Sequence, residues 1–160
     1  MKTYEDALEE VNTYKDKLDQ VVDDGIKDVV VGLVMHGFVT SGSCEGHPRD
    51  SSYYNRCYPW VNLNYPVPEN EWDEKQRDPW YLLNITQQQK LSDKLEAFYA
   101  DHEPVIFKAM LVINSIGAGI AELRPYGAEF IELEEDFRTM HKIYLEEMNT
   151  FAKFLITTAN

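Results

Sequence analysis

The sequence predicts a single α+β domain covering residues 1–160. Apolar residues recur at helical spacing near both ends of the chain, whereas short segments in the middle alternate between apolar and polar residues. A chain of this length suits one hydrophobic core. We therefore expect about four mostly antiparallel strands, with helices packed on one face of the sheet and a long C-terminal helix.

Two helices are expected before the first strand. Apolar side chains recur at helical spacing over 3–22, where Thr3 is a candidate N-cap, and again over 26–34. The β-branched residues at 29–31 would also suit a strand. Because Gly37 follows this pattern in the position of a C-terminal cap, we predict a helix there.

The middle of the chain contains the four expected strands, at 38–43, 60–65, 105–113 and 120–123. Between Tyr65 and Leu82 the sequence has three prolines and no periodicity, which predicts a long loop. A capping-box pattern at Thr86 predicts a helix from there to about residue 102. The last helix is predicted over 133–155, where apolar residues again recur at helical spacing.

The excess of acidic residues bears on possible partners. With 28 acidic and 15 basic side chains, the formal net charge is −13, which disfavours nucleic acid as a partner because its phosphates would be repelled. Solubility is the simplest explanation of this charge, and the alternative is an acidic surface that docks on a basic protein. No apolar run is long enough to span a membrane. The acidic N-terminus and the two cysteines predict a cytoplasmic protein without a secretory signal.

The most distinctive motif is Thr-Ser-Gly-Ser-Cys-Glu-Gly-His at 40–47, where a predicted strand runs into a turn. Its two glycines permit positive φ and a close approach of the backbone to a ligand. The amide groups of consecutive small residues can converge on an anion. Cys44, Glu45 and His47 add three chemically capable side chains. The simplest interpretation is a tight turn whose polar groups only satisfy one another.

This motif resembles a pattern in small uncharacterised bacterial and phage proteins, in which a Gly-aromatic-x-Thr strand leads into a Ser-Cys-x-Gly-His turn. Here the pattern is carried by 37–47, by Pro59-Trp60-Val61 and by Leu123-Arg124-Pro125. The resemblance extends over most of the chain and implies no established function. The turn is also similar, more distantly, to the Ser-Cys-Ser-Gly segment of the wybutosine-synthesising protein 3 family of tRNA-modifying methyltransferases. His47 stands where an arginine is expected in that family, and its activity is not carried over.

Three chemistries fit the turn. Zinc is the first, since Cys44 and His47 have usable ligand spacing. Cys57 and His36 are the further candidate ligands, although only one short ligand pair is present. The second chemistry is nucleophilic catalysis by Cys44, with His47 lowering its pKa and Glu45 orienting the imidazole. The third is binding of an anionic or nucleotide-like small molecule by the turn amides, the histidine and nearby arginines.

Aromatic side chains concentrate after the motif. Residues 53–81 contain eight of them, including all three tryptophans. Trp60 lies on a predicted strand, whereas Trp72 and Trp80 lie among charged residues. The last two would either pin the predicted loop to the domain or contact a ligand or a protein partner.

These observations favour a cytoplasmic binding protein with a site for an anionic or nucleotide-like ligand at the Ser43–His47 turn. The predicted binding residues are Ser43, Cys44, Glu45, Gly46, His47, Arg49, Trp60 and Arg124. We expect no stoichiometric metal and no cofactor, and if the protein is an enzyme, Cys44 and His47 are its catalytic candidates. The alternative is a phage or mobile-element protein that inhibits a host factor through its acidic surface. The sequence leaves the oligomeric state open.

Overall fold

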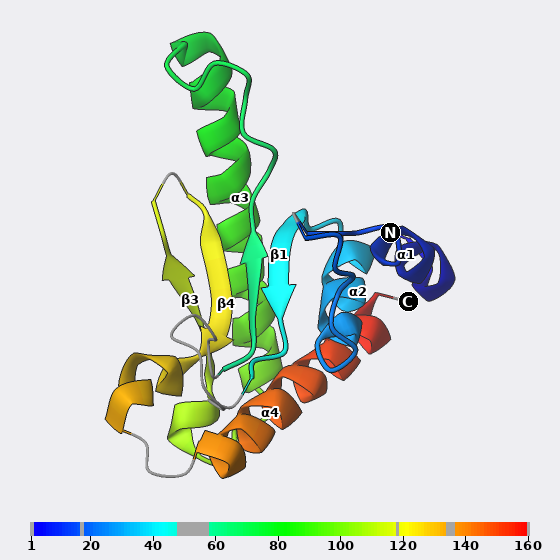
Figure 1. Cartoon of the computed structure of the whole chain (residues 1–160), viewed down its shortest axis with the longest axis vertical. Helices are drawn as coiled ribbons and strands as arrows, with labels where there is room; N and C mark the ends of the chain where they lie inside the picture. Colours follow the sequence, from blue (N-terminus) through cyan, green and yellow to red (C-terminus); the bar gives the residue numbers. More distant parts are fainter. Residues whose placement is uncertain (1, 17, 48–57, 118, 134–136, 160) are drawn as a thin grey trace.

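A four-stranded antiparallel sheet organises the computed structural model (Figure 1), which describes residues 2–16, 18–47, 58–117, 119–133 and 137–159. The strands are β1 (Thr40–Cys44), β2 (Trp60–Leu63), β3 (Leu111–Ser115) and β4 (Ala121–Pro125), in the order β1-β2-β4-β3. The α-helices are α1 (Tyr4–Val11), α2 (Lys27–Met35), α3 (Glu74–Tyr99) and α4 (Phe137–Thr158). Two 3-10 helices, η1 (Phe107–Ala109) and η2 (Tyr126–Leu133), follow α3 and β4. The predicted α+β class, the antiparallel strands and the long C-terminal helix are confirmed.

The pairing register divides the strand residues between two faces of the sheet. Val61 and Leu123 lie opposite each other on β2 and β4, and both are buried in the core. Cys44 pairs with Trp60 on the adjacent position of the ladder. Because side chains alternate along a strand, the antiparallel ladder brings Arg124 beside Trp60. Cys44, Trp60 and Arg124 therefore form a row across three strands on the other face, where Trp60 packs against a second buried cluster that includes Tyr58 and Tyr144.

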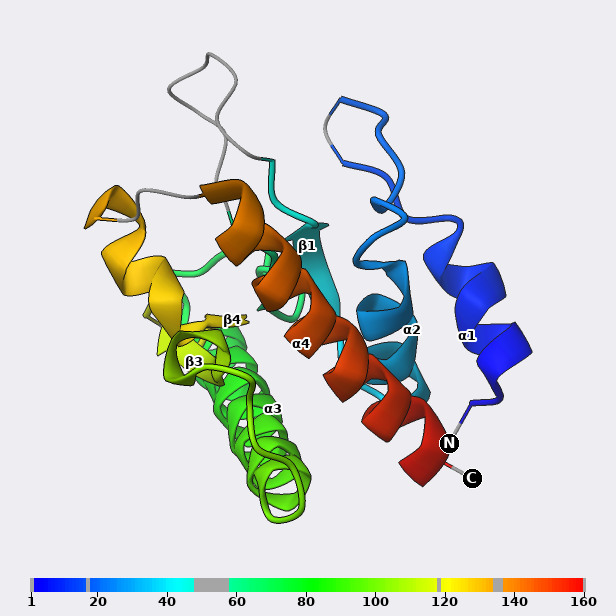
Figure 2. The ribbon, with the colours of Figure 1, turned by 90° about the horizontal axis from the view of Figure 1, so that it is seen from below.

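The hydrophobic core lies between the sheet and helices α2, α3 and α4. Every residue of α2 from Val29 to Met35 is buried, so this β-branched segment is a helix whose whole surface is apolar. The helix packs closely on α4, since a Cβ at Gly32 would come within 2.9 Å of the Leu155 Cβ. Seen from below, α4, α2 and α1 lie side by side (Figure 2).

Helix α3 is the largest difference from the sequence prediction. It is a single helix of 26 residues that includes Pro79, whereas the sequence predicts a loop up to Leu82 and a helix from Thr86. Asp73 caps its first turn by accepting a hydrogen bond from the Lys75 N–H. The predicted start of this helix is therefore wrong by about three turns. Contacts with distant segments, which a local sequence pattern does not contain, stabilise its first half.

Three buried side chains on one face of α3 make those contacts. The Trp80 Nε1–H donates to the Tyr65 carbonyl oxygen at 2.9 Å. The Asn84 Oδ1 accepts from the Tyr65 N–H at 2.9 Å, and the Gln87 Oε1 accepts from the Val39 N–H at 2.7 Å. Spacings of four and three residues place these side chains on one helix face. They hold α3 to the main chain beside β1 and β2.

Two other elements are shorter than the sequence predicts. Helix α1 ends at Val11, and beyond it Lys15 and Val21 form an isolated antiparallel bridge. The strand predicted over 105–113 begins only at Leu111, because η1 occupies the residues before it.

Candidate functional site

The turn after β1 has a backbone shape that requires glycine at one position. Gly46 has a φ of 82°, in the left-handed region. A Cβ there would lie 2.6 Å from the Tyr58 carbonyl carbon, so the turn approaches this main chain more closely than a side chain would allow. Gly42 is less constrained, since its Cβ would make ordinary contact with the Trp60 ring. The close approach predicted for the glycines is thus required at Gly46, and it is made to the chain itself.

Glu45 fastens the turn at three points. Its N–H donates to Oδ2 of Asp23 at 3.1 Å. Its carboxylate oxygen Oε2 accepts from the Gly25 N–H at 2.8 Å. Its carbonyl oxygen lies 2.8 Å from Nε2 of His141 on α4. Glu45 therefore ties the turn to α4 and to the segment before α2, and its carboxylate is engaged there instead of orienting His47.

Asp23, Cys44 and His47, which we call the turn cluster, bring together a carboxylate, a thiol and an imidazole. One potential ligand atom from each lies within 4.8 Å of the other two. Asp23 and Cys44 are half-buried, and His47 is exposed. Sequence reasoning missed Asp23 because helix α2 separates it from the motif. The only local signal is the Asp-Asp-Gly turn that begins with it.

Burial raises the pKa of the Cys44 thiol, and the carboxylates of Asp23 and Glu45 raise it further. The Gly46 N–H, which donates to the Cys44 Sγ at 3.3 Å, acts in the opposite direction but is outweighed. The thiol is therefore protonated at neutral pH. Because the nucleophile of a catalytic cysteine is the thiolate, this environment opposes nucleophilic catalysis by the metal-free protein.

Arg124 lies on the same sheet face as Cys44, two strands away. Its Nη1 is 3.3 Å from Oε1 of Glu122, a carboxylate on a residue that is only 2% exposed. Its guanidinium carbon lies 6.0 Å from the centre of the Tyr58 ring. The sequence predicts that Arg124 binds an anionic ligand. In the structure, its positive charge is balanced by the buried carboxylate of Glu122.

Of the remaining candidate residues, the two that the structure describes, Ser43 and His36, are not brought to the turn cluster. Ser43 pairs with a core residue and lies on the core-facing side of the sheet. Arg49 and Cys57 lie outside the described residues. His36, a candidate zinc ligand, is buried, and its Nε2 lies 2.8 Å from the Leu155 carbonyl oxygen. Burial lowers the pKa of His36, and this histidine connects α2 to α4.

The two tryptophans of the charged segment differ in exposure. Trp80 is buried and pins α3 to the chain after β2, as one of its two interpretations predicts. Trp72 is 85% exposed, just before α3 begins. A large aromatic surface in water is a candidate contact for a partner.

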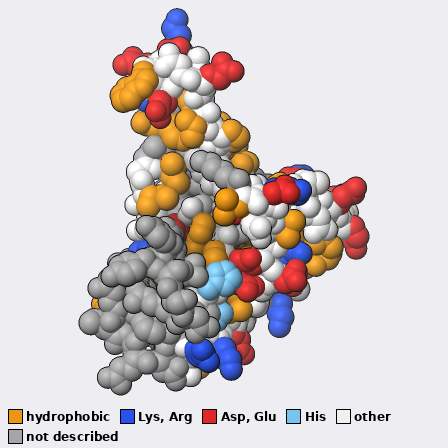
Figure 3. All heavy atoms as spheres, in the orientation of Figure 1, with side chains coloured by type: hydrophobic (Ala, Val, Ile, Leu, Met, Phe, Trp, Pro, Cys, Tyr) orange, Lys and Arg blue, Asp and Glu red, His pale blue; other side chains and the backbone are white. Residues whose placement is uncertain are grey.

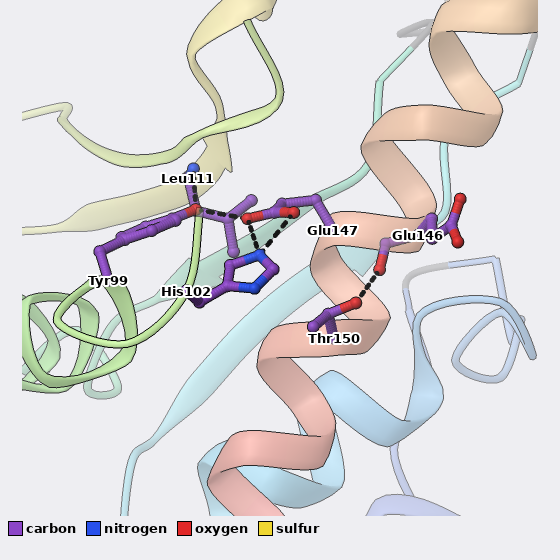
Figure 4. Close-up of polar contacts among 6 residues, drawn as sticks. All are labelled: Tyr99, His102, Leu111, Glu146, Glu147 and Thr150. Carbon is purple, nitrogen blue, oxygen red and sulfur yellow. Dashed lines mark hydrogen bonds and ion pairs between the residues drawn. The ribbon is translucent and has the colours of Figure 1, made fainter. Parts of the chain in front are cut away.

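A second titratable cluster lies between α3 and α4 (Figure 4) and consists of Tyr99, His102 and Glu147. Glu147 is 4% exposed and accepts a hydrogen bond from the Tyr99 hydroxyl at 2.9 Å. The His102 Nε2 lies 3.0 and 3.1 Å from its two carboxylate oxygens. The Tyr99 oxygen in turn accepts from the Leu111 N–H at 2.7 Å. Burial raises the pKa of Tyr99, and the cluster joins α3, α4 and β3.

Comparisons with protein-family models, curated proteins and solved structures found no match. The resemblances of the 40–47 motif therefore stay predictions. Over the described part of the chain, no helix is both long enough and apolar enough to cross a membrane.

Proposed function

We propose, in place of the sequence-based expectation of no stoichiometric metal, that this chain is a small binding protein whose turn cluster holds a divalent transition-metal ion. Zinc is the best chemical fit. The observation that supports this is the convergence of three different donor types within 4.8 Å of one another. Thiolate, imidazole and carboxylate all bind zinc, at about 2.0–2.3 Å. Small rotations of the exposed His47 side chain and of Asp23 would complete the geometry.

Charge at the turn favours a cation over an anion. Asp23 and the Cys44 thiolate would together balance the two positive charges of the ion. An anion would instead face Asp23, and the N–H groups of Glu45 and Gly46 already donate to acceptors within the chain. The sequence predicts an anion bound by the amide groups of this turn. We propose a metal ion at the same turn instead.

An anionic ligand fits this proposal as a second step. Three protein ligands leave one position of a tetrahedral ion for water or for an incoming anion. Trp60 and Arg124 share the sheet face of Cys44. A ligand on the metal that extended along this face would meet the Trp60 ring, whereas the Arg124 guanidinium beyond it is already paired with Glu122.

Metal binding should release the Cys44 proton, because only the thiolate coordinates. Since burial and the nearby carboxylates raise the pKa of this thiol, the proton is present throughout the neutral range. The apparent affinity should therefore rise by about tenfold per pH unit between pH 6 and 8 on this account alone.

Cobalt titration of tag-free protein tests the proposal. Co²⁺ bound through Cys44 should give a thiolate-to-metal charge-transfer band, and one equivalent of zinc should abolish it. Asp23→Asn, Cys44→Ser and His47→Ala should each weaken binding by about 100-fold. The matched control is Asp24→Asn, which makes the same charge change one residue away, where the exposed Asp24 carboxylate pairs with Lys27.

A cobalt spectrum unchanged in Cys44→Ser, or equal losses in Asp24→Asn and Asp23→Asn, would contradict the proposed ligand set. Calorimetry of zinc-loaded protein against nucleotides and sugar phosphates then tests the second step. Failure of this anion panel with metal binding intact would remove only the anionic ligand from the proposal.

A further inference from the structure

The first half of α3 projects beyond the end of the sheet (Figure 1). The chain after β2 runs out along this projection, and α3 begins at its far end. The β3–β4 turn meets the helix at Asn84 and Ile85, where a Cβ on Gly119 would lie 2.9 Å from Ile85. The helical turns before Asn84 therefore extend past the hairpin.

Hydrophobic side chains are exposed on and beside this projection. We call them the apolar tip: Val67, Trp72, Leu82, Leu83, Ile85 and Ile116. Trp72 is 85% exposed, Leu82 65% and Ile85 55%. Figure 3 shows hydrophobic side chains along the projecting part of the molecule, with acidic side chains around its end and a basic side chain at its outermost point. Leu82 and Ile85 are neighbours on the helix surface, and exposed apolar patches mark interaction sites on proteins in water.

The tip is not the side of α3 that the fold uses. The buried contacts of this half of the helix come from Trp80, Asn84 and Gln87. Leu82 and Ile85 are three residues apart and share a different face of the helix. Ile85 meets the β3–β4 turn at Gly119 but is still 55% exposed, and Leu82 is 65% exposed. Both side chains therefore leave apolar area that a partner could bury.

The rim of the tip is acidic. Glu69, Glu71, Glu74 and Asp78 are exposed there. The Arg77 Nη2 lies 3.0 Å from Oδ1 of Asp78 and 3.7 Å from Oε1 of Glu74. The positive charge of Arg77 is therefore balanced by carboxylates of the rim itself. The helix N-terminus accounts for Glu74, but Glu69 and Glu71 precede the helix. The surface as a whole combines an apolar centre with a negative border.

We propose that the apolar tip docks a basic amphipathic segment of another protein. Such a segment would bury Trp72, Leu82 and Ile85 against its own apolar side chains and place lysines or arginines opposite the acidic rim. A second copy of this chain is a poor occupant, because each copy has a net charge of −13 and would present the same acidic rim. This inference is independent of the turn cluster and of any metal there.

The test uses a synthetic helical peptide of leucine and lysine with one apolar face, and a scrambled peptide of the same composition. Trp72 is the most exposed of the three tryptophans, so binding at the tip should shift tryptophan emission to the blue and protect it from quenching. Leu82→Asp, followed by the same emission, and Trp72→Ala, followed by calorimetry because it removes the reporter, should each weaken binding by about tenfold or more. Val105→Asp is the matched control, since Val105 is 77% exposed beyond the other end of α3.

The proposal requires that the amphipathic peptide bind more tightly than the scrambled one and than a leucine–glutamate counterpart. Equal binding of the scrambled peptide would mean attraction to net charge alone and would overturn it. Equal losses in Leu82→Asp and Val105→Asp would also overturn it. Sedimentation of the wild type provides the last arm: a dimer that Leu82→Asp dissociates would assign the tip to a second copy of the chain.

Discussion

Glu147 and Asp23 each lie close to a histidine, but the fold surrounds them differently. Glu147 is buried, and the Tyr99 hydroxyl and His102 imidazole are directed at its carboxylate. Asp23 is half-buried, accepts one hydrogen bond from the Glu45 N–H and another from the Cys44 thiol, and lies near an exposed imidazole. A carboxylate enclosed by donors of its own chain holds elements together. A carboxylate that shares an accessible cluster with other donor types is free to hold an ion.

This difference has an energetic consequence. Removing a buried partner leaves polar groups without the hydrogen bonds for which the fold was arranged, so the loss appears as stability. Removing the exposed His47 side chain from the turn cluster should leave folding nearly unchanged and appear as lost binding. The predictions below use this contrast, beginning with the largest expected effect.

Glu147→Ala should lower the free energy of unfolding by about 3–5 kcal/mol, because it leaves the Tyr99 hydroxyl and His102 without their shared acceptor. Urea unfolding at pH 7 measures the loss. Glu146→Ala is the matched control on the same helix (Figure 4), where the exposed Glu146 contributes only its main-chain carbonyl oxygen to Thr150. That variant should stay within about 0.5 kcal/mol of the wild type. Similar losses of unfolding free energy in Glu147→Ala and Glu146→Ala would mean that the buried Glu147 carboxylate does not hold these elements together.

Gly46→Ala should cost about 2–3 kcal/mol. The φ of 82° is strained for alanine, and its Cβ would lie 2.6 Å from the Tyr58 carbonyl carbon. Gly42→Ala in β1 should cost far less, since its Cβ would be 3.6 Å from the Trp60 ring. Thermal unfolding of both variants checks this. A larger loss of stability in Gly42→Ala than in Gly46→Ala would contradict the close approach of the turn to Tyr58.

The fold could be predicted where the apolar pattern and the tertiary environment agree. Helix α2 follows from its apolar spacing together with Gly37 as a C-terminal cap, and strand β2 follows from alternation, because the core buries residues 29–31 and also Val61 and Leu63. Helix α3 could not be predicted in its first half. Pro79 and the acidic residues favour a loop locally, and the contacts from Trp80 to Tyr65 that stabilise the helix connect segments with no common pattern.

The site could be predicted in part. The motif identified Cys44 and His47, and the strand register places Arg124 on the same sheet face as Cys44, where it pairs with Glu122. Asp23 could not be found, because its approach depends on how the chain enters α2. The spacing of His36 suggested a zinc ligand, whereas its position at the end of α2 directs it to the Leu155 carbonyl oxygen. The spacing of residues along the chain does not show toward which neighbouring helix a side chain such as His36 points.

The last and smallest effect concerns the reactivity of Cys44, and it separates a metal ligand from a catalytic nucleophile. Because burial and the carboxylates of Asp23 and Glu45 raise its pKa above the ordinary thiol value, the thiolate fraction at pH 7 should be lower than in an unstructured peptide. Each unit of that shift lowers the fraction by about tenfold. In a Cys57→Ser background, alkylation by iodoacetamide should therefore be slower than that of the peptide and should still be accelerating at pH 9. Asp23→Asn should increase the rate by removing one of the charges that raise the pKa, and zinc should decrease it by occupying the sulfur. Alkylation faster than the peptide at pH 7 would instead favour a catalytic cysteine and reverse the assignment of the turn.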